Sequence, residues 1–381
     1  MVPMPRPEII DTVARLTARF GGSTFTTAQA EAAGIAAHRV KSAVRTGDVL
    51  RLRRGHYRLA VTSRGTDGTR RSQQPASPVA GMTPLEESRV RDAITALPQI
   101  QAAVGLVRAG AAWDIPTWEI PPSPTPTILV PKGSGVRSGV RNGLRFAMRA
   151  VSEDHIVMGP GGIPMTDPLL TGIHLAESRR LSLGAQLVVL HGAIRRQAEF
   201  DEAVWRRHSD SSCDVSGGTA ADERLDRHDL ARLMADQGFR RALIDRAVVT
   251  AEEANLRGIR RVIKALHLAD PRVETALESL SWAAFIGAGI PLPTPQALVR
   301  GESGKVWRVD FLFEGRVIGE CDGAVKYHAG QSLWQEKKRQ MDLENAGYVV
   351  VRWTWAEIVS RPHVVLARIA LALSRARRTA S

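Results

Sequence analysis

The amino-acid sequence predicts a multidomain α+β / α/β protein. Three observations support this fold class: short helical patterns before a hairpin within residues 1–60, a mixed middle region, and the element order αβββαβ in residues 271–381. The length of 381 residues allows two or three domains of ordinary size. The hydrophobic content of 44% is typical of a globular chain and not of a disordered one.

Residues 1–60 contain three helical patterns followed by two strand patterns. Residues 8–20 have helical periodicity, and Thr26 or Thr27 is placed to cap a short second helix. Residues 36–46 predict a third helix, and residues 49–59 alternate as in a hairpin. Three short helices and a hairpin are the element order of a winged helix-turn-helix, which we expect here as a DNA-binding domain.

Basic side chains gather on the third helix and the hairpin. A winged helix inserts its recognition helix into the major groove and contacts phosphates with its wing. We therefore expect duplex DNA to be bound by His38, Arg39, Lys41, Arg45, Arg51, Arg53, Arg54 and Arg58. The alternative is a hairpin that contacts protein, and the sequence gives no base preference.

Composition divides the rest of the chain. Residues 61–80 are rich in Gly, Ser, Thr and Pro and predict a linker. Residues 81–200 predict a mixed α/β middle domain, with a buried strand at 127–130 and a helix at 181–196. Residues 201–270 are charged and mostly helical, which predicts a helical connector.

The charge balance favours a polyanionic partner. Lysine and arginine number 52 against 39 acidic residues, a net charge of +13. Such a surface attracts nucleic acid or, less often, an anionic membrane. The alternative is a general preference for arginine in the protein's composition.

Cysteine usage and hydropathy indicate in which cellular compartment the protein is expected. Cys213 and Cys321 are far apart, so a disulfide framework or a cysteine-based zinc site is not expected. No run of residues approaches the roughly 18 apolar residues of a membrane span, and the first residues lack the apolar core of a signal peptide. We expect a cytoplasmic protein without a membrane partner.

The C-terminal region follows the order αβββαβ and ends in a basic helix. Its expected elements are a helix at 273–289, strands at 296–301, 305–315 and 316–321, a helix at 332–347, a strand at 348–353 and a helix at 362–378. This order is the core of the restriction-endonuclease-like fold.

Three carboxylates lie on two neighbouring strands of this region. Asp310 precedes the turn at Glu314-Gly315, and Glu320 and Asp322, two residues apart, point to one face of a continuous strand. A hairpin that brings them together creates a repulsive cluster unless a cation is bound. Mg²⁺ prefers such oxygen ligands and activates water for phosphodiester hydrolysis. The alternatives are an edge-strand carboxylate at Asp310 and a simple turn after Asp322.

The segments RVDFLF, GECDGAVKYH and EKKRQMDLENAGYVVVRWTWAEI resemble the very-short-patch-repair-like endonucleases of the PD-(D/E)XK superfamily. The resemblance covers residues 271–380. It implies that Asp310 and Glu320 bind Mg²⁺ or Mn²⁺ together with the carbonyl of Cys321. It also implies that Glu278, on the preceding helix, approaches the ion through water.

The chain departs from the usual E-x-K pattern of that superfamily. Asp322 stands at the expected lysine position, and Lys326, four residues later, would supply the missing cation near the leaving oxyanion. We expect Trp353 and Trp355 in the core and not as platforms for bases. Weaker candidates for the cationic role are His328 and Lys337.

The N-terminal unit resembles the N-terminal domain of AbiEi-family antitoxins through FTTAQAEAAG, the following HRV and RLRRGHYRL. Those antitoxins bind DNA and repress their own operon. The resemblance implies a DNA partner and a toxin or defence-system partner.

Together these features predict a metal-dependent DNA endonuclease with an N-terminal DNA-binding domain, in phage defence or a toxin–antitoxin system. Its last helix would help to hold duplex DNA through Arg368, Arg375, Arg377 and Arg378. The alternative is a transcriptional regulator or antitoxin whose nuclease-like domain is catalytically degenerate. A third possibility is a nuclease toxin directed at RNA.

Overall fold

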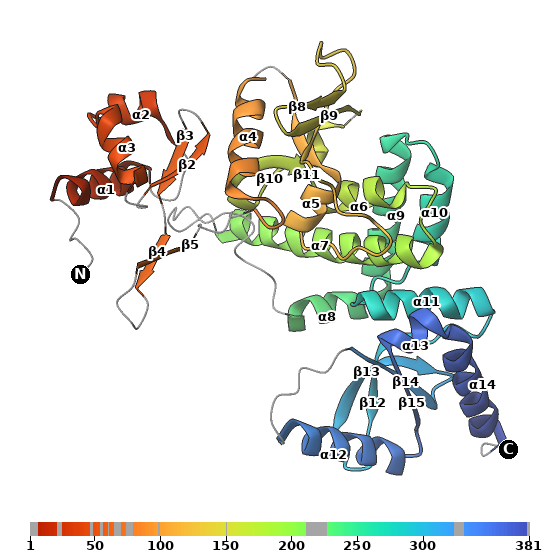
Figure 1. Cartoon of the computed structure of the whole chain (residues 1–381). Coiled ribbons are helices and arrows are strands. Elements are labelled where there is room, and N and C mark those ends of the chain that lie inside the picture. The colour runs from red at the N-terminus through yellow and green to blue at the C-terminus, as the bar shows by residue number, and fades with distance from the viewer. Residues whose placement is uncertain are drawn as a thin grey trace. The chain divides into compact units, whose positions relative to one another are not determined.

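The computed structural model divides the chain into two compact units. The first contains residues 1–104 and 124–149, and the second contains residues 105–123 and 150–381 (Figure 1). The structure describes residues 7–20, 25–45, 49–53, 56–59, 61–64, 70–73, 79–97, 100–149, 151–210, 227–323 and 331–378. The multidomain mixed α/β character is confirmed, whereas the boundaries predicted at residues 60, 80, 200 and 270 stay predictions.

The first unit begins with three helices and a small sheet. The elements are α1 (Pro7–Phe20), β1 (Phe25–Thr26), α2 (Thr27–Ala32), α3 (Ala37–Arg45), β2 (Val49–Arg53) and β3 (His56–Leu59). Thr26 caps α2: its hydroxyl accepts the Gln29 N–H at 3.1 Å, and its own N–H donates to Gln29 Oε1 at 2.8 Å. β3 pairs antiparallel with both β1 and β2. The predicted order of helices and strands is therefore present.

A short strand pair lies in the segment predicted as a linker. β4 (Val61–Arg64) and β5 (Arg70–Gln73) pair antiparallel. Composition alone missed them because Gly, Ser and Thr are common both in linkers and around tight hairpin turns.

The remainder of the first unit contains a capped helix and several strands. They are α4 (Pro84–Thr95), β6 (Ala103–Gly105, which reaches the edge of the unit), β7 (Thr127–Val130), β8 (Gly139–Arg141) and β9 (Leu144–Met148). β7 is buried along its whole length, as predicted, and pairs parallel with β9. β8 and β9 form a hairpin through Asn142-Gly143, whose φ angles of 51° and 71° suit a tight hairpin turn.

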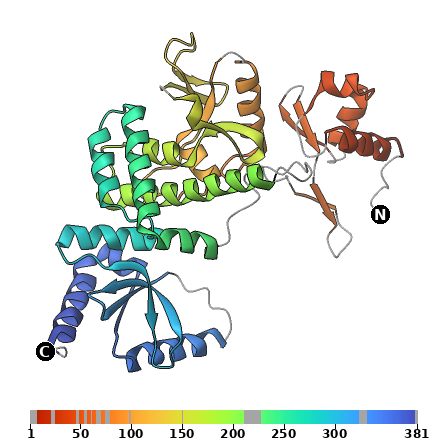
Figure 2. The same cartoon turned by 180° about the vertical axis from the view of Figure 1, so that it is seen from behind.

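Helices dominate the first half of the second unit. They are α5 (Leu106–Ala112), α6 (Pro168–Ala176), α7 (Leu183–Asp210), α8 (Arg227–Ala235), α9 (Gln237–Ala254) and α10 (Ile259–Leu268), with the hairpin β10 (Ile156–Gly159) and β11 (Ile163–Thr166). The predicted helix at 181–196 is the start of α7, which lies beside α6 (Figure 2). Buried side chains such as Leu170, Ile173, Leu190 and Leu266 join these helices in one core.

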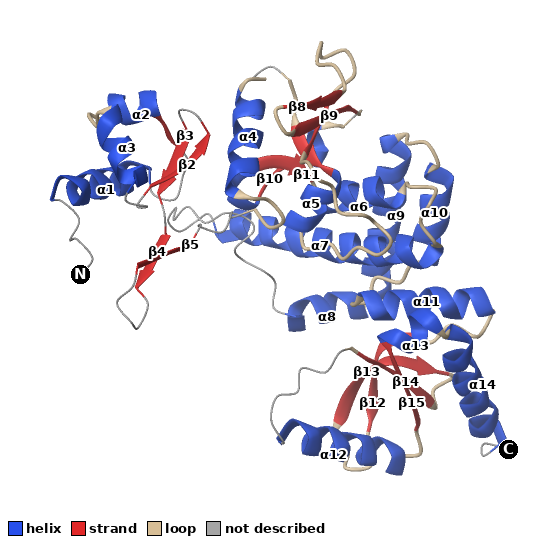
Figure 3. Cartoon of the chain, viewed as in Figure 1, coloured by secondary structure: helices blue, strands red, loops and turns tan. Residues whose placement is uncertain are grey.

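The C-terminal part of the second unit has the predicted order of elements and one more helix. The elements are α11 (Ala276–Ala288), β12 (Thr294–Arg300), β13 (Val306–Phe313), β14 (Val317–Asp322), α12 (Gln331–Asn345), β15 (Val349–Thr354), α13 (Trp355–Ser360) and α14 (Pro362–Arg378). The sheet order is β12-β13-β14-β15, with β14 and β15 parallel and the other pairs antiparallel (Figure 3). Because β14 and β15 are parallel, the chain must cross over between them, and α12 is part of this crossover connection.

Helices cover both faces of this sheet. Phe311, Phe313 and Trp353 pack against α11 and α14 on one face, and Ile318 with Leu343 of α12 forms a smaller core on the other. Trp353 is 1% exposed and donates from Nε1 to Ser281 Oγ at 2.8 Å. The prediction of a core role for Trp353 is thus confirmed.

Helix α7 also packs into this C-terminal core. Leu187 is fully buried there. His191 Nε2 accepts the Asp270 N–H at 3.2 Å, so Nδ1 carries the proton and donates to Ser279 Oγ at 2.9 Å. Burial lowers the pKa of His191 to about 3, which keeps the ring neutral. The sheet, whose first strand begins at Thr294, is therefore supported by a helix that begins far upstream in the sequence, at Leu183.

Candidate functional site

Two buried carboxylates and a partly buried one lie near one another where α11 faces β13 and β14. Glu278 belongs to α11, Asp310 to β13 and Glu320 to β14. Glu278 is 3% exposed and Glu320 is 8% exposed. We call these three residues the carboxylate cluster.

Each member of the cluster holds its proton more tightly than a carboxyl group in water. Burial, with the nearby Asp310 charge, raises the pKa of Glu278 to about 7 and that of Glu320 to about 7. Burial also raises the pKa of Asp310. Like charges that lie close together repel one another, so a cation nearby favours their ionised forms.

Glu278 closes the N-terminus of α11. Its Oε1 accepts the Thr275 hydroxyl at 2.8 Å, and its Oε2 accepts the Glu274 N–H at 2.9 Å and the Gln296 side-chain amide at 3.0 Å. Thr275 in return accepts the Glu278 N–H. These bonds give Glu278 a structural role in helix capping beside any role at a bound ion.

Glu320 and Asp310 have different partners. Arg339 of α12 donates from Nη2 to Glu320 Oε1 at 2.8 Å. Asp310 Oδ2 accepts the backbone N–H of Cys321 at 2.7 Å. A fixed cation therefore offsets Glu320, while Asp310 is held by the main chain of the neighbouring strand.

Asp322 lies at the end of β14, partly exposed, and next to arginine. Arg352 Nη1 is 3.5 Å from Asp322 Oδ1 and also forms an ion pair with Glu336. Burial raises the pKa of Asp322, and Arg352 opposes that shift. The cation nearest this position among the described residues is thus Arg352, on β15.

The donor set suits a hard divalent ion only in part. Carboxylates such as Asp310 and Glu320 are the ligands that Mg²⁺ or Mn²⁺ takes, often only one or two per ion. The Cys321 carbonyl accepts the Gly323 N–H at 3.0 Å. Within the described ranges, no group of three or more His, Cys, Asp or Glu side chains is arranged to hold a metal ion. Lys326 and His328 lie outside the described residues.

The basic residues predicted to bind DNA are distributed over α3, β2 and β3. His38 and Lys41 are exposed on α3, and Arg39 is half-buried with Nη1 3.9 Å from Asp11 Oδ2. The structure places Arg45 at the end of α3, but its side chain is not among those described. The predicted wing arginines are Arg51, Arg53, Arg54 and Arg58. Those in β2 and β3 have a described backbone but no described side chain, and Arg54 lies outside the described residues.

The arginines of α14 are largely occupied by partners in the same unit. Arg368 donates to Glu357 Oε1 at 2.6 Å, and Arg377 Nε donates to Glu314 Oε2 at 2.8 Å. Arg378 donates to Ser374 Oγ at 2.7 Å. Their support of DNA, expected from the sequence, would have to compete with these contacts.

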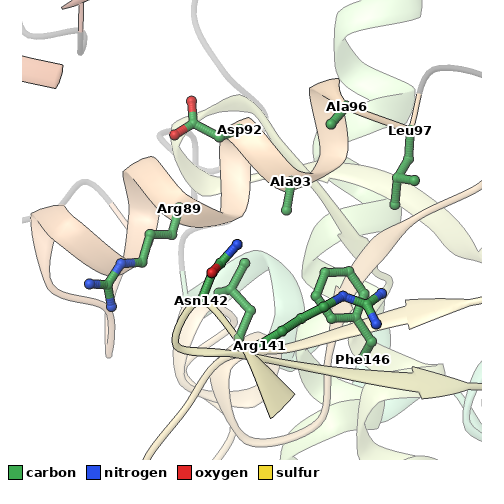
Figure 4. A pocket seen from close by; sticks show the side chains of 9 residues that line it. Arg89, Asp92, Ala93, Ala96, Leu97, Arg141, Asn142 and Phe146 are labelled. Carbon is green, nitrogen blue, oxygen red and sulfur yellow. The ribbon is translucent and has the colours of Figure 1, made fainter. Parts of the chain in front are cut away.

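The first unit contains a separate cavity of about 300 Å³ between α4 and the β8–β9 hairpin (Figure 4). The Arg141 guanidinium lies 4.0 Å from the centre of the Phe146 ring. Arg89 extends away from that ring, and the space beside Gly143 is taken up by its guanidinium. The two arginines do not converge on one point, so the cavity does not form an anion site.

The comparison with known families decides the identity of the N-terminal domain. Residues 14–60 match the family of AbiEi antitoxin transcriptional regulators. This AbiEi-type domain runs from within α1 to the end of the β2–β3 hairpin. It is the part of the chain for which a DNA-binding regulator is indicated.

Two curated proteins of Mycobacterium tuberculosis are similar to part of the chain. They are the uncharacterized proteins MT2308 of strain CDC 1551 and Rv2248 of strain H37Rv, each 34% identical over 138 residues. The match covers 36% of this chain and 50% of each relative. The chain therefore spans about half the length of the curated relatives it matches.

Sequence reasoning missed two features of the site. Arg339 was part of a basic helix pattern, but its contact with Glu320 depends on how α12 packs on the sheet. The pairing of Asp322 with Arg352 follows from the parallel register of β14 and β15, which places Asp322 beside Thr354.

None of the helices in the described part of the chain has the length and apolar content that crossing a membrane requires.

Proposed function

We propose that the protein is a DNA-binding transcriptional regulator of the antitoxin type, with a winged helix-turn-helix formed by α1–α3 and β2–β3. The match of residues 14–60 to the AbiEi antitoxin regulators carries this proposal. The net charge of +13 supports it, because it favours the encounter with DNA. The setting would be the cytoplasm, with a toxin or a defence-system protein as partner.

Helix α3 would read the major groove. His38 and Lys41 are exposed on it, and Arg39 lies close enough to Asp11 to be held in position before DNA arrives. Because the Arg39 pair is long and partly exposed, it adds little stability and is easily exchanged for a phosphate.

Binding to a labelled duplex from the promoter of the protein's own gene tests this function. We expect Lys41→Gln and Arg39→Gln to weaken binding by about tenfold each, the loss of a single good base or phosphate contact. Lys132→Gln, an exposed lysine after β7, is the matched control. If the α3 variants bind the duplex as the control does, α3 is not the reading helix.

We infer metal-dependent phosphodiester hydrolysis as a second candidate function. The observation that favours it is the carboxylate cluster, in which burial and the nearby Asp310 charge raise the pKa of Glu278 and of Glu320 to about 7. Buried carboxylates of this kind are common where a cation or a proton is handled. The four-stranded sheet with its helices supports a restriction-endonuclease-like fold.

In this second function Asp310 and Glu320 would hold Mg²⁺ or Mn²⁺. The ion would supply an activated water and neutralise charge on the phosphate in the transition state. Arg339 orients Glu320, and Glu278 fixes the start of α11 against β12 through Gln296. Lys326 would be the cation that replaces the lysine of the usual motif.

Incubation with plasmid DNA and Mg²⁺ or Mn²⁺ tests the second function. Cleavage that disappears in Asp310→Asn and Glu320→Gln supports it, and Glu314→Gln is a control on the turn between the same strands. If the wild-type protein leaves the plasmid intact but retards the promoter duplex in a gel, the nuclease function is excluded and only the regulator function stands. Cleavage of RNA but not DNA supports the RNA-directed alternative.

A further inference from the structure

A groove of about 1150 Å³ lies along α12 in the second unit. One wall is the face of α12, and the other is the β12–β13 loop with the start of β13. The groove is separate from the AbiEi-type domain, which belongs to the first unit. It is also distinct from the carboxylate cluster, although Arg339 lines it from the shared helix.

The α12 wall presents one exposed face that carries both apolar and cationic residues. Trp334, Lys337, Lys338 and Met341 are spaced three, one and three residues apart, so they lie on the same side of the helix. Trp334 is 69% exposed and Met341 is 55% exposed. The Lys338 ammonium is 5.8 Å from the centre of the Trp334 ring. Trp334 therefore presents a large flat ring to solvent, and Met341 and the two lysines lie beside it on the same face.

The opposite wall carries a second tryptophan. Lys305 Nζ lies 3.8 Å from the centre of the Trp307 ring, and Trp307 Nε1 donates to Asp342 Oδ2 at 2.6 Å. Trp307 is therefore held in place with one face under a cation. Trp334, which is 69% exposed, is the more open of the two rings and the one a base could stack on.

Acidic residues also line the groove, but each has an internal partner. Asp342 accepts the Ser303 N–H at 2.7 Å, Glu302 accepts the Asn345 amide at 2.8 Å, and Glu336 pairs with Arg352. In contrast, Lys337 and Lys338 form no ion pair with any residue that the structure describes. The carboxylates are thus held by partners within the protein, whereas these two ammonium groups are free to reach a ligand.

We propose that this groove binds single-stranded DNA, with a base stacked on Trp334 and phosphates contacted by Lys337 and Lys338. An exposed aromatic ring beside cations is the usual combination for binding single strands, since every base has a flat face and every linkage a charge. A duplex would hide its bases from the indole. DNA is the strand of choice because the same chain carries an AbiEi-type regulator domain. This activity goes beyond duplex recognition by α3.

Fluorescence anisotropy of a labelled oligothymidine of about 20 nucleotides with the full-length protein tests the proposal. We expect Trp334→Ala to weaken binding by about tenfold, from the loss of one stacked base. Leu298→Ala, at a side chain 71% exposed in β12, is the matched apolar control and should bind as wild type does.

The lysines are tested by salt dependence. For the double variant Lys337→Gln/Lys338→Gln, the slope of log affinity against log salt should fall by about 1.4, two lost phosphate contacts on a single strand. Lys132→Gln is the matched lysine control. If circular dichroism shows that Trp334→Ala does not fold, this double variant still tests the proposal.

Each of three outcomes would overturn the proposal. In the first, Trp334→Ala binds oligothymidine as tightly as Leu298→Ala does. In the other two, the groove prefers single-stranded RNA to DNA, or binds an acidic peptide and no oligonucleotide. Promoter-duplex binding by the same variants should be unchanged. The promoter duplex therefore tests the proposed regulator function through Lys41→Gln, and the oligothymidine tests this groove, so a failure of one proposal is distinguishable from a failure of the other.

Discussion

Arg339 Nη2 donates to Glu320 Oε1 at 2.8 Å and to the Arg308 carbonyl at 2.8 Å. One guanidinium thus connects α12 with two strands of the C-terminal sheet at its most acidic point. Since the side chains of this pair are 23% and 11% exposed, water screens the interaction only weakly.

Removing this cation should destabilise the protein. Arg339→Gln leaves Glu320 buried without its partner, and we expect the free energy of unfolding at neutral pH to fall by about 1–3 kcal/mol. Adding Glu320→Gln should restore part of the loss, because the unpaired charge is gone. Urea unfolding of the two single variants and the double variant measures this, with Lys338→Gln as control. A double variant less stable than Arg339→Gln would contradict the pairing.

His191 predicts a loss of stability in acid. Its pKa is about 3 in the folded protein against 6.5 in water, so between these values the unfolded chain takes up about one proton more than the folded one. Stability should therefore fall as the pH drops from 6.5 towards 3, and this fall should be smaller in His191→Gln. Urea unfolding over that pH range is the measurement. The exposed His267→Gln should behave as wild type does.

His155 predicts the opposite trend. The hydrogen bond of its Nδ1 to Asp167 Oδ2, 2.7 Å long, raises its pKa above 6.5. Its contribution to stability is complete below pH 6.5 and is lost as the pH rises through the higher folded value. His155→Asn should remove this dependence in unfolding experiments on the alkaline side. His363→Asn, at an exposed position, is the control, and equal pH profiles for the two variants would refute the assignment.

Gly319 is required by the close packing of Trp353. A Cβ at Gly319 would lie 2.6 Å from Trp353 Cη2 and 3.0 Å from its Cζ3. We expect Gly319→Ala to destabilise the protein by about 1–3 kcal/mol, since the indole is enclosed and cannot move away. At Gly323 a Cβ would meet nothing within 4 Å, so Gly323→Ala should be close to neutral. Thermal or urea unfolding of both variants decides whether the contact is as tight as described.

Local signals in the sequence predicted much of the fold. The Thr26 cap and the turn at Gly315 follow from residue types that favour one backbone geometry. The buried strand at 127–130 follows from an unbroken apolar run. In contrast α13 (Trp355–Ser360) was not predicted, because six residues directly after a strand carry too short a pattern.

The candidate site was predictable only as far as neighbouring strands determine it. Asp310 and Glu320 were expected to approach each other, and the Asp310 charge contributes to the raised pKa of Glu320. What the carboxylates bind to depends on contacts between distant elements: Arg339 reaches Glu320 from α12, and Glu278 is held by Gln296 of β12. No local spacing encodes such contacts, since packing angles set them.

The burial of Leu187 and the hydrogen bonds of His191 make α7 part of the C-terminal core. A fragment cut at residue 271 would leave both behind and expose an apolar seam along α11. Such a fragment would aggregate when expressed alone. For the same reason, recombination could not transplant the sheet into another protein as an independent module unless α7 moved with it.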